Sequence, residues 1–338
     1  MLLKIKNYFK YKLPRLYRYV RDLLFPIYVK LRSRNLKKFL HYVKDINFNG
    51  VKYKLVLRAE NGFVDEEIYW KGVYEEEVML TLQKEIVNAF VSDAVGVTHK
   101  SEILFLDIGA NIGQELIFAG AIARDILNKN NLNIKNKISF KVIGFEPISR
   151  LYDQVNESIK ANNFNNVVGL DVQIMNYALG DKNEELMLKS PVINVGGSSL
   201  VRNESNTVGE IREEKIVVKK GDDIIYHILK TQASLKLIIK IDVEGYEYEV
   251  IKGLRETIKR YSPTIIIEYS PVFYIEHSAM GDRSKKGIDT LEIFKEENYR
   301  MEVIDIGEYK NKTYKGEEII SWAKDFKGEQ ANLLFIPR

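Results

Sequence analysis

Residues 104–113 read LFLDIGANIG and decide the fold class. An apolar run ends in Asp107, glycines follow at Gly109 and Gly113, and a segment with helical spacing comes next. This order is typical of a strand that delivers a carboxylate and open backbone to a ligand at a helix N-terminus. Glycine has no Cβ, so a ligand can approach the chain closely there. An ordinary strand–turn–helix unit of an α/β protein would also fit this stretch alone.

A second apolar run, at 142–147, reads VIGFEP and ends in Glu146 and Pro147. In nucleotide-binding α/β sheets, an acid at the end of the second strand accepts hydrogen bonds from ribose hydroxyls. The dinucleotide fingerprint G-x-G-x-x-G is not met, because position 111 is Asn, and Glu146 comes later than the roughly 20 residues expected. A polar, Asn-rich stretch at 128–137 explains the delay. An adenosyl ligand without a pyrophosphate is therefore favoured over NAD.

Three further motifs follow in chain order: ALGD at 178–181, LIIKIDVEGYE at 237–247 and TIIIE at 264–268. With DIGANIG, FEP and a Gly-Gly-Ser-Ser stretch at 196–199, this order resembles the FkbM-type methyltransferases, which use S-adenosylmethionine. The pair Tyr74-Glu75 resembles the Tyr-Glu pair that often precedes the first strand in that family. The resemblance covers residues from about 70 to 337.

The resemblance implies a class I methyltransferase fold. This fold is a Rossmann-like, seven-stranded α/β sheet that is mostly parallel and ends in an antiparallel C-terminal hairpin. The alternation of apolar runs and helical spacing from 103 to 298 itself predicts a parallel sheet with helices on both faces. Strands are expected at 103–108, 140–146, 172–179, 236–242 and 264–269, and the hairpin at 299–306 and 331–337.

Residues 1–70 are predicted to form a basic N-terminal extension followed by a small β-rich segment, and 71–338 the S-adenosylmethionine-binding domain. Two short strands are expected at 51–57 and 67–70, around a turn at 60–62. Two further strands are expected on either side of a long polar segment, at 184–189 and 214–220.

Residues 1–42 hold twelve Lys and Arg against one acid, Asp22, and interleave them with Tyr and Leu. Helical spacing at 16–24 favours a basic amphipathic helix, which is typical of peripheral contact with an anionic membrane or of partner binding. A solvated helix packed on the catalytic domain is the competing interpretation. We expect no nucleic-acid partner, because no recognised nucleic-acid module surrounds the basic residues.

The chain has no cysteine, which excludes disulfides, thiolate metal sites and a cysteine nucleophile. Its four histidines show no zinc-site spacing. No run approaches the roughly 18 apolar residues of a membrane span, and no signal peptide is recognisable. Since the methyl donor that the resemblance implies is made in the cytoplasm, we expect cytoplasmic residence, with peripheral contact at the inner face of the membrane.

The strand ends and the resemblance together suggest a donor site. Its amino-acid end would be held by the turn and its carboxylate, its ribose by the acid of the second strand, and its adenine near the third strand. The residues expected there are Asp107, Gly109, Asn111, Gly113, Glu146, Pro147, Asn176 and Ala178. Alternatively, Asp107 is a helix cap and Glu146 only precedes a helix.

Asp242, Glu244 and Glu268 are expected at the same carboxyl edge of the sheet. Asp242 would act as a general base or, with Glu244, as a ligand of Mg²⁺ or Mn²⁺. Glu268 would bind an acceptor hydroxyl, and His277 in a following loop could take a proton. Alternatively, Glu244 and Glu247 complement the dipole of the next helix.

The favoured function is methylation of an oxygen of a sugar, glycan or related hydroxylated compound, with the acceptor class taken from the resemblance. One alternative is an NAD-linked oxidoreductase or epimerase. A second is a non-catalytic binding protein on a degenerate methyltransferase fold.

Overall fold

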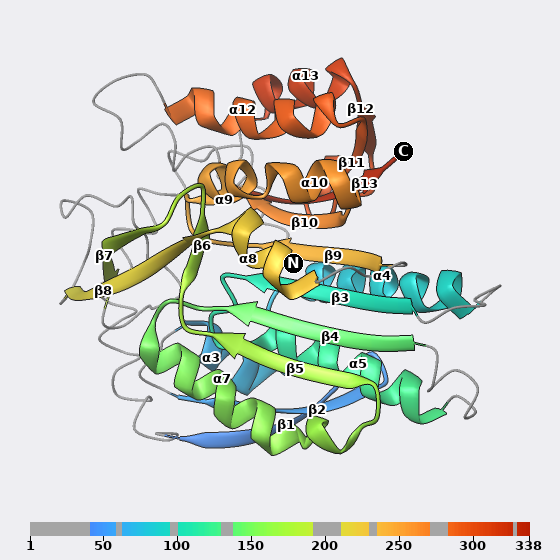
Figure 1. Ribbon diagram of the computed structural model, residues 1–338, viewed down its shortest axis with the longest axis vertical. Coiled ribbons are helices and arrows are strands. Elements are labelled where there is room, and N and C mark those ends of the chain that lie inside the picture. Colours follow the sequence, from blue (N-terminus) through green and yellow to red (C-terminus); the bar gives the residue numbers. More distant parts are fainter. Residues whose placement is uncertain are drawn as a thin grey trace.

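An eight-stranded sheet runs through the middle of the molecule (Figure 1), in the order β12-β11-β13-β10-β9-β3-β4-β5. The computed structural model describes residues 41–58, 63–94, 101–129, 138–191, 211–229, 235–270, 283–326 and 330–338. A hairpin, β1-β2, and a three-stranded sheet, β6-β8-β7, accompany the large sheet.

The strands are β1 (Tyr42–Phe48), β2 (Val51–Leu57), β3 (Ser101–Ile108), β4 (Ile138–Phe145), β5 (Leu170–Met175), β6 (Ala178–Gly180), β7 (Glu184–Pro191), β8 (Ile211–Lys220), β9 (Leu235–Ile241), β10 (Thr264–Tyr269), β11 (Tyr299–Val303), β12 (Thr313–Lys315) and β13 (Ala331–Pro337). The helices are α3 (Phe63–Lys71), α4 (Glu76–Ala94), α5 (Gln114–Lys129), α7 (Ser149–Asn162), α8 (Gly221–Leu229), α9 (Glu247–Gly253), α10 (Arg255–Tyr261), α12 (Arg283–Glu296) and α13 (Glu317–Asp325), with 3₁₀ turns η3 (Phe164–Asn166) and η6 (Gly307–Tyr309).

The continuous apolar sequence of β3 reflects its position at the centre of the sheet. Every residue of β3 is buried, and the strand pairs in parallel with β4 on one side and β9 on the other. Ile103 and Phe105 join a core with α4, α5 and α7, whereas Leu104 and Leu106 join a second core with α9, α10 and α12. Alternate side chains thus anchor helices to both faces of the sheet.

The structure confirms the predicted fold class. β5, β4, β3, β9 and β10 are parallel, and β13 runs antiparallel to both β10 and β11. The sheet has one strand more than the expected seven, because the short β12 pairs with the outer edge of β11. None of the helices in the described part of the chain has the length and apolar character that crossing a bilayer requires.

The strand expected at 67–70 was wrong, because these residues belong to helix α3. The hairpin partner of β2 is β1, and the turn between them is Asn49-Gly50, both with positive φ. The chain contains a second Asn-Gly pair at 61–62, outside the described residues, which drew the prediction to the wrong turn. Helix α3 is held by Asp65, which accepts hydrogen bonds from the Arg58 amide at 2.7 Å and Gln154 Nε2 at 2.9 Å.

Helix α7 supplies side chains that pair with the free edge of β2. Asn162 accepts from the Lys54 amide at 2.9 Å and donates to the Lys54 carbonyl at 2.7 Å. Ser158 Oγ accepts from the Val56 amide at 3.0 Å. These contacts satisfy strand groups that would otherwise be buried without partners.

The strand expected at 172–179 is divided in the structure. β5 ends at Met175, and Ala178 begins β6 in the three-stranded sheet. Between them, Asn176 Nδ2 donates to the carbonyls of Glu146 and Pro147, each at 3.1 Å, and fixes the turn. The predicted strands at 184–189 and 214–220 are present as the antiparallel pair β7 and β8. The helix expected at 16–24 lies outside the described residues.

Replacing Gly253 with Ala should destabilise the protein by about 1–3 kcal/mol, the usual cost of overpacking. A Cβ at Gly253 would lie 1.9 Å from the Gly180 carbonyl oxygen, so α9 and β6 would have to separate. Urea unfolding checks this. The control is Gly307→Ala, where a Cβ would have no neighbour within 4 Å. Equal stability of the two variants would contradict the expectation.

Candidate active site

Polar side chains gather where the parallel strands of the large sheet end. Asp107 lies near the end of β3, Glu146 follows β4, Asn176 follows β5, Asp242 follows β9 and Glu268 lies near the end of β10. From β3 the chain continues to β4 and then β5 on one side of the sheet. It later returns to add β9 and then β10 on the other side of β3, so the order of the strands reverses at β3. Ligands of open α/β sheets bind at such a reversal, outside the carboxyl ends.

The glycine turn after β3 is tied to Glu146. Glu146 Oε2 accepts from the Asn111 amide and Oε1 from the Ile148 amide, both at 2.9 Å. Each carboxylate oxygen keeps a second acceptor position for a ligand hydroxyl. Burial raises the pKa of Glu146 to about 8, although the two amide hydrogen bonds oppose that shift.

The turn glycine Gly109 is required by the protein itself. Its φ is +85°, and a Cβ there would lie 1.8 Å from the Asp242 carbonyl oxygen. The Asp242 amide also donates to the Ile108 carbonyl at 3.0 Å. The turn after β3 therefore packs directly on the end of β9, which places it beside the residues that follow β9.

A buried lysine connects the ends of β3 and β9. Lys240 Nζ lies 3.9 Å from Asp107 Oδ1 and 3.2 Å from Asp242 Oδ2. Burial lowers the pKa of Lys240, but the carboxylates of Asp242, Glu115 and Asp107 outweigh it and raise the pKa well above its ordinary value.

Asp107 is completely buried, and neither of its carboxylate oxygens makes a hydrogen bond of standard geometry to another described residue. Burial raises its pKa to about 7, opposed by Lys240. A buried carboxylate whose remaining acceptor positions are unfilled suits a cationic or hydrogen-bonding ligand.

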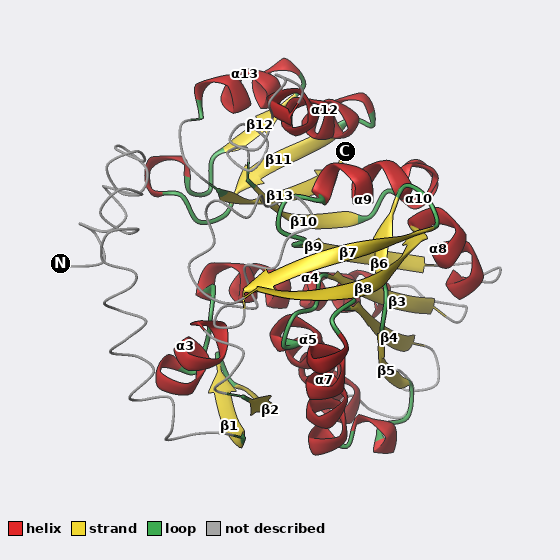
Figure 2. Cartoon of the chain, turned by 90° about the vertical axis from the view of Figure 1, so that its left-hand side faces the viewer, coloured by secondary structure: helices red, strands yellow, loops and turns green. Residues whose placement is uncertain are grey.

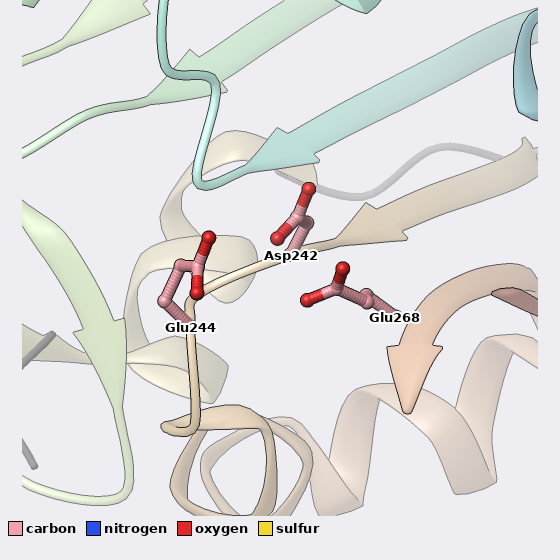
Figure 3. Close-up of side chains that lie close together, drawn as sticks. All are labelled: Asp242, Glu244 and Glu268. Carbon is pink, nitrogen blue, oxygen red and sulfur yellow. The ribbon is translucent and has the colours of Figure 1, made fainter. Parts of the chain in front are cut away.

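Asp242, Glu244 and Glu268 converge on one point (Figure 3), and one carboxylate oxygen of each lies within 4.8 Å of the others. Glu268 is buried, and its Oε1 accepts from Gln330 Nε2 at 2.7 Å. Burial, followed by the charges of Asp242 and Glu244, raises the pKa of Glu268 well above its ordinary value. Three carboxylates this close repel one another unless a proton or a cation lies among them.

Glu75 also belongs to this acidic environment, although we assigned it no role from the sequence. Burial, together with the charge of Asp242, raises the pKa of Glu75 to about 8. The preceding residue, Tyr74, is held by Gln114, which accepts from its amide at 2.8 Å and donates to its carbonyl at 3.0 Å. The Tyr74-Glu75 pair was noted from the resemblance alone, and only the fold, which brings the loop before α4 to β9, gives Glu75 a place in the site.

Two glutamates near this edge have strained backbone conformations. Among the described residues other than glycine, positive φ values occur at Asn and Ser, and also at Glu75 (49°) and Glu244 (52°). The left-handed region is unfavourable for glutamate and costs on the order of 1–3 kcal/mol. The two strained glutamates are both charge neighbours of Glu268.

The remaining predicted residues have other positions. Ala178 lies on β6, and Pro147 lies beside Asn176, which hydrogen-bonds its carbonyl. Glu247 accepts from the Gly245 amide at 3.0 Å, so it stabilises the loop that carries Glu244. His277 and the Gly-Gly-Ser-Ser stretch at 196–199 lie outside the described residues.

The stability of the ligand-free protein should depend on pH through Glu146. Its carboxyl has a pKa of about 8 in the folded chain against an ordinary 4.5. The protonated carboxyl therefore contributes stability that is fully present below about pH 4.5. This stability is lost as the pH rises through about 8 and the buried carboxyl must ionise. Gln cannot ionise, so the Glu146→Gln variant does not lose this stability. The difference in melting temperature, variant minus wild type, should therefore increase as the pH is raised from about 5 to about 9.

Thermal melts across this range provide the measurement. Glu185→Gln, at an exposed residue of β7 paired with Lys215, is the matched control. A difference between Glu146→Gln and wild type that stays constant with pH would contradict the assignment.

Comparison with known proteins gives the family. A family model described as the methyltransferase FkbM domain matches residues 107–301, which is more than half of the chain. No curated protein sequence matches.

Several solved structures are similar to the chain at low identity. A methyltransferase FkbM of Methylobacillus flagellatus KT is 15% identical, with 80% of this chain and 59% of that chain covered and a TM-score of 0.35. A precorrin-6y C5,15-methyltransferase of Geobacter metallireducens is 11% identical, with 79% and 90% covered and a TM-score of 0.32. The TYW2 protein of P. horikoshii, in complex with MeSAdo, is 12% identical, with 87% and 71% covered and a TM-score of 0.28.

The chain thus spans less than two thirds of the length of the Methylobacillus methyltransferase that it matches. The family model covers more than half of the chain, and its match includes the strand ends described above. This chain therefore belongs to the FkbM methyltransferase family.

Proposed function

We propose that the chain transfers the methyl group of S-adenosylmethionine to a hydroxyl oxygen of a sugar, glycan or related hydroxylated compound. The observation that carries this proposal is the contact between two groups of residues at one sheet edge. The glycine turn and Glu146 offer a donor site, and Asp242, Glu244 and Glu268 form an acidic cluster beside it. The choice of oxygen and of a glycan rests on the resemblance of the sequence motifs.

The charge of this edge favours a sulfonium donor over a dinucleotide. The charge of Asp242 acts on Asp107, Glu75 and Glu268, and the buried ammonium of Lys240 interacts with Asp242, Asp107 and Glu75. A sulfonium adds positive charge to this environment, which is favourable, whereas the pyrophosphate of NAD would add negative charge. This argument disfavours the oxidoreductase alternative, and the unfilled acceptor positions of Asp107 and Glu146 disfavour a degenerate site.

Methyl transfer is an in-line displacement in which the acceptor oxygen bonds to the methyl carbon as the sulfur–carbon bond breaks. The hydroxyl proton must leave as this bond forms, so a base in contact with the hydroxyl is needed. Asp242 is the proposed base, because it lies beside the turn, is partly exposed and is positioned by Lys240. Glu268 would hold the acceptor hydroxyl.

The three carboxylates also fit a divalent cation. Mg²⁺ and Mn²⁺ prefer oxygen ligands, and Asp242, Glu244 and Glu268 each offer one. When bound, such a cation would lower the pKa of an acceptor hydroxyl and orient it. In that case these residues would be its ligands.

Asp107→Asn and Glu146→Gln should each weaken binding of S-adenosylhomocysteine by at least about tenfold, equivalent to about 1.4 kcal/mol. Each variant replaces a carboxyl oxygen, which can accept a hydrogen bond from the donor, by an amide nitrogen that can only donate one. Titration calorimetry measures the affinity, and circular dichroism checks folding. The control is Asp65→Asn, a buried carboxylate between α3 and α7, which should leave the affinity unchanged. Unaltered affinity in both site variants would overturn the donor site.

Asp242→Asn should lower turnover about 10²–10⁴-fold, the range for losing general acid–base catalysis. Donor affinity should change far less, because donor binding does not need this group. Turnover is measured as donor-dependent methylation of hydroxylated sugars, detected by mass spectrometry. Near-normal turnover would exclude Asp242 as the base.

Chelation separates the base from the metal interpretation. If a cation acts, EDTA should abolish turnover and Mg²⁺ or Mn²⁺ should restore it. Full activity in EDTA would leave Asp242 as a base acting without a metal ion.

A further inference from the structure

Helix α7 begins close to the candidate donor residue Glu146 and has no cap of its own. Its first residue is Ser149, and the preceding residue, Ile148, makes no side-chain hydrogen bond to the helix. The first turn of α7 also contains no acidic residue. The amides at the start of a helix need acceptors and carry a partial positive charge. An acceptor for α7 must therefore come from elsewhere in the chain.

Glu214, which lies on β8 and 65 residues further along the chain, supplies this acceptor. Its Oε1 accepts from the Ser149 amide at 3.1 Å and from the Ser149 hydroxyl at 2.7 Å. Along β8, Glu214 lies on the same face as Ile216 and Val218, which are buried in the same core as Ile148. Packing alone would favour another apolar residue at position 214. The carboxylate there is explained by its contact with α7.

The three-stranded sheet that carries Glu214 is also fixed to the acceptor half of the site. Lys252 of α9 pairs with Asp181, next to β6, at 2.7 Å. Tyr246, in the loop between β9 and α9, donates to Glu184 Oε1 of β7 at 3.3 Å. Figure 2 looks toward the carboxyl ends of the large sheet, and β7 and β8 extend across them, as they also project beyond these ends in Figure 1. The sheet is therefore a fixed base from which Glu214 reaches α7.

The amide that Glu214 binds is next to an amide that holds Glu146. Glu146 Oε1 accepts from the Ile148 amide and Oε2 from the Asn111 amide of the glycine turn, both at 2.9 Å. A side chain at the start of a helix commonly accepts from the amide two or three residues later. The Ser149 amide lies three residues after Glu146, so it would draw Glu146 away from the turn if Glu214 did not occupy it. Burial is the main cause of the raised pKa of Glu146, and the charge of Glu214 adds to it, so repulsion also keeps the two carboxylates apart.

We propose that Glu214 is a positioning residue of the donor site. From β8 it occupies the Ser149 amide and thereby keeps the Glu146 carboxylate on the glycine turn, where its free acceptor positions meet the ribose hydroxyls of the donor. Glu214 acts through Ser149 and Glu146 and not on the donor itself. This proposal rests on the proposed function, because it concerns the affinity for S-adenosyl compounds.

Titration calorimetry of the full chain with S-adenosylhomocysteine tests the proposal. Glu214→Ala should weaken binding by about fivefold or more, because the start of α7 loses its cap. Glu214→Gln keeps an acceptor oxygen and should bind nearly as tightly as wild type. The matched control is Glu213→Ala, which removes the neighbouring carboxylate on the opposite face of β8, where it pairs with Lys189 at 3.3 Å, and should leave the affinity unchanged. Circular dichroism checks that each variant is folded.

A second substitution separates positioning from a general effect on stability. Proline is favoured at the first position of a helix, and the extended backbone of Ile148 (φ −77°, ψ 114°) suits a following proline. Ser149→Pro removes the amide hydrogen and the hydroxyl that Glu214 binds, so no free amide remains there to attract Glu146. In the Ser149→Pro background, Glu214→Ala should therefore leave the affinity for S-adenosylhomocysteine unchanged.

The outcomes distinguish this proposal from the proposed function. Equal affinity of wild type and Glu214→Ala, with weaker binding by Glu146→Gln, would overturn the role of Glu214 and leave the donor site intact. The same loss of affinity from Glu214→Ala with and without Ser149→Pro would also overturn it, because Glu214 would then not act through the Ser149 amide. Wild-type protein that does not bind S-adenosylhomocysteine would overturn the donor site, and this proposal with it.

Discussion

The site depends on the ion pairs that the buried ammonium of Lys240 forms with Asp107 and Asp242. The ammonium lies between Asp107 at the end of β3 and Asp242 at the end of β9, so it joins the proposed donor and acceptor halves across one strand pair. Removing one partner of a buried ion pair costs about 3–5 kcal/mol, because the other charge remains buried and uncompensated. Gly109 depends on the same arrangement, since its turn packs on the Asp242 carbonyl. The pairing of β3 and β9 thus fixes both halves of the site relative to each other.

Negative charge exceeds positive charge around this pair. The raised pKa values of Glu75 and Glu268 arise from burial and from repulsion by Asp242. This excess suits the proposed reaction, in which a sulfonium becomes a neutral thioether and a hydroxyl releases a proton. The positive charge lost at sulfur reappears as that proton, so the carboxylates face a cation before and after the transfer. A carboxylate that takes up this proton beside the acceptor hydroxyl fits the movement of positive charge from sulfur to proton.

The sequence could predict the central sheet because its parallel strands are buried on both faces and read as apolar runs. The strand at 264–269 was predicted to the residue, and β3, β4 and β9 within two residues. Helix α3 was missed because Asp65 holds it through hydrogen bonds from the Arg58 amide and from Gln154. The first is a backbone contact that the pattern of apolar residues does not show, and the second comes from a residue far away in the sequence. The division after Met175 was missed because it depends on the side chain of Asn176 reaching two carbonyls.

Within the site, the strand-end acids were predictable and their surroundings were not. The end of each parallel strand must reach one edge, so Asp107, Glu146, Asp242 and Glu268 were expected together. Gly109 was expected to make room for a ligand, but the structure supplies a different reason, the contact with Asp242. Glu75 belongs to a loop before α4, and only tertiary packing brings its charge to that of Asp242.

Backbone strain and charge repulsion occur together at one edge of the sheet. Glu75 and Glu244 have left-handed backbone conformations, and both influence the charge of Glu268 electrostatically. Either feature alone would destabilise the fold, and a stability-driven sequence would replace these glutamates by Asn or Gly at the same backbone positions. Retaining glutamate at 244 keeps its carboxylate beside those of Asp242 and Glu268, where a cation would relieve their repulsion. This combination of strain and repulsion is what the proposed role predicts, because an active site commonly gives up stability of the empty protein for binding its ligand.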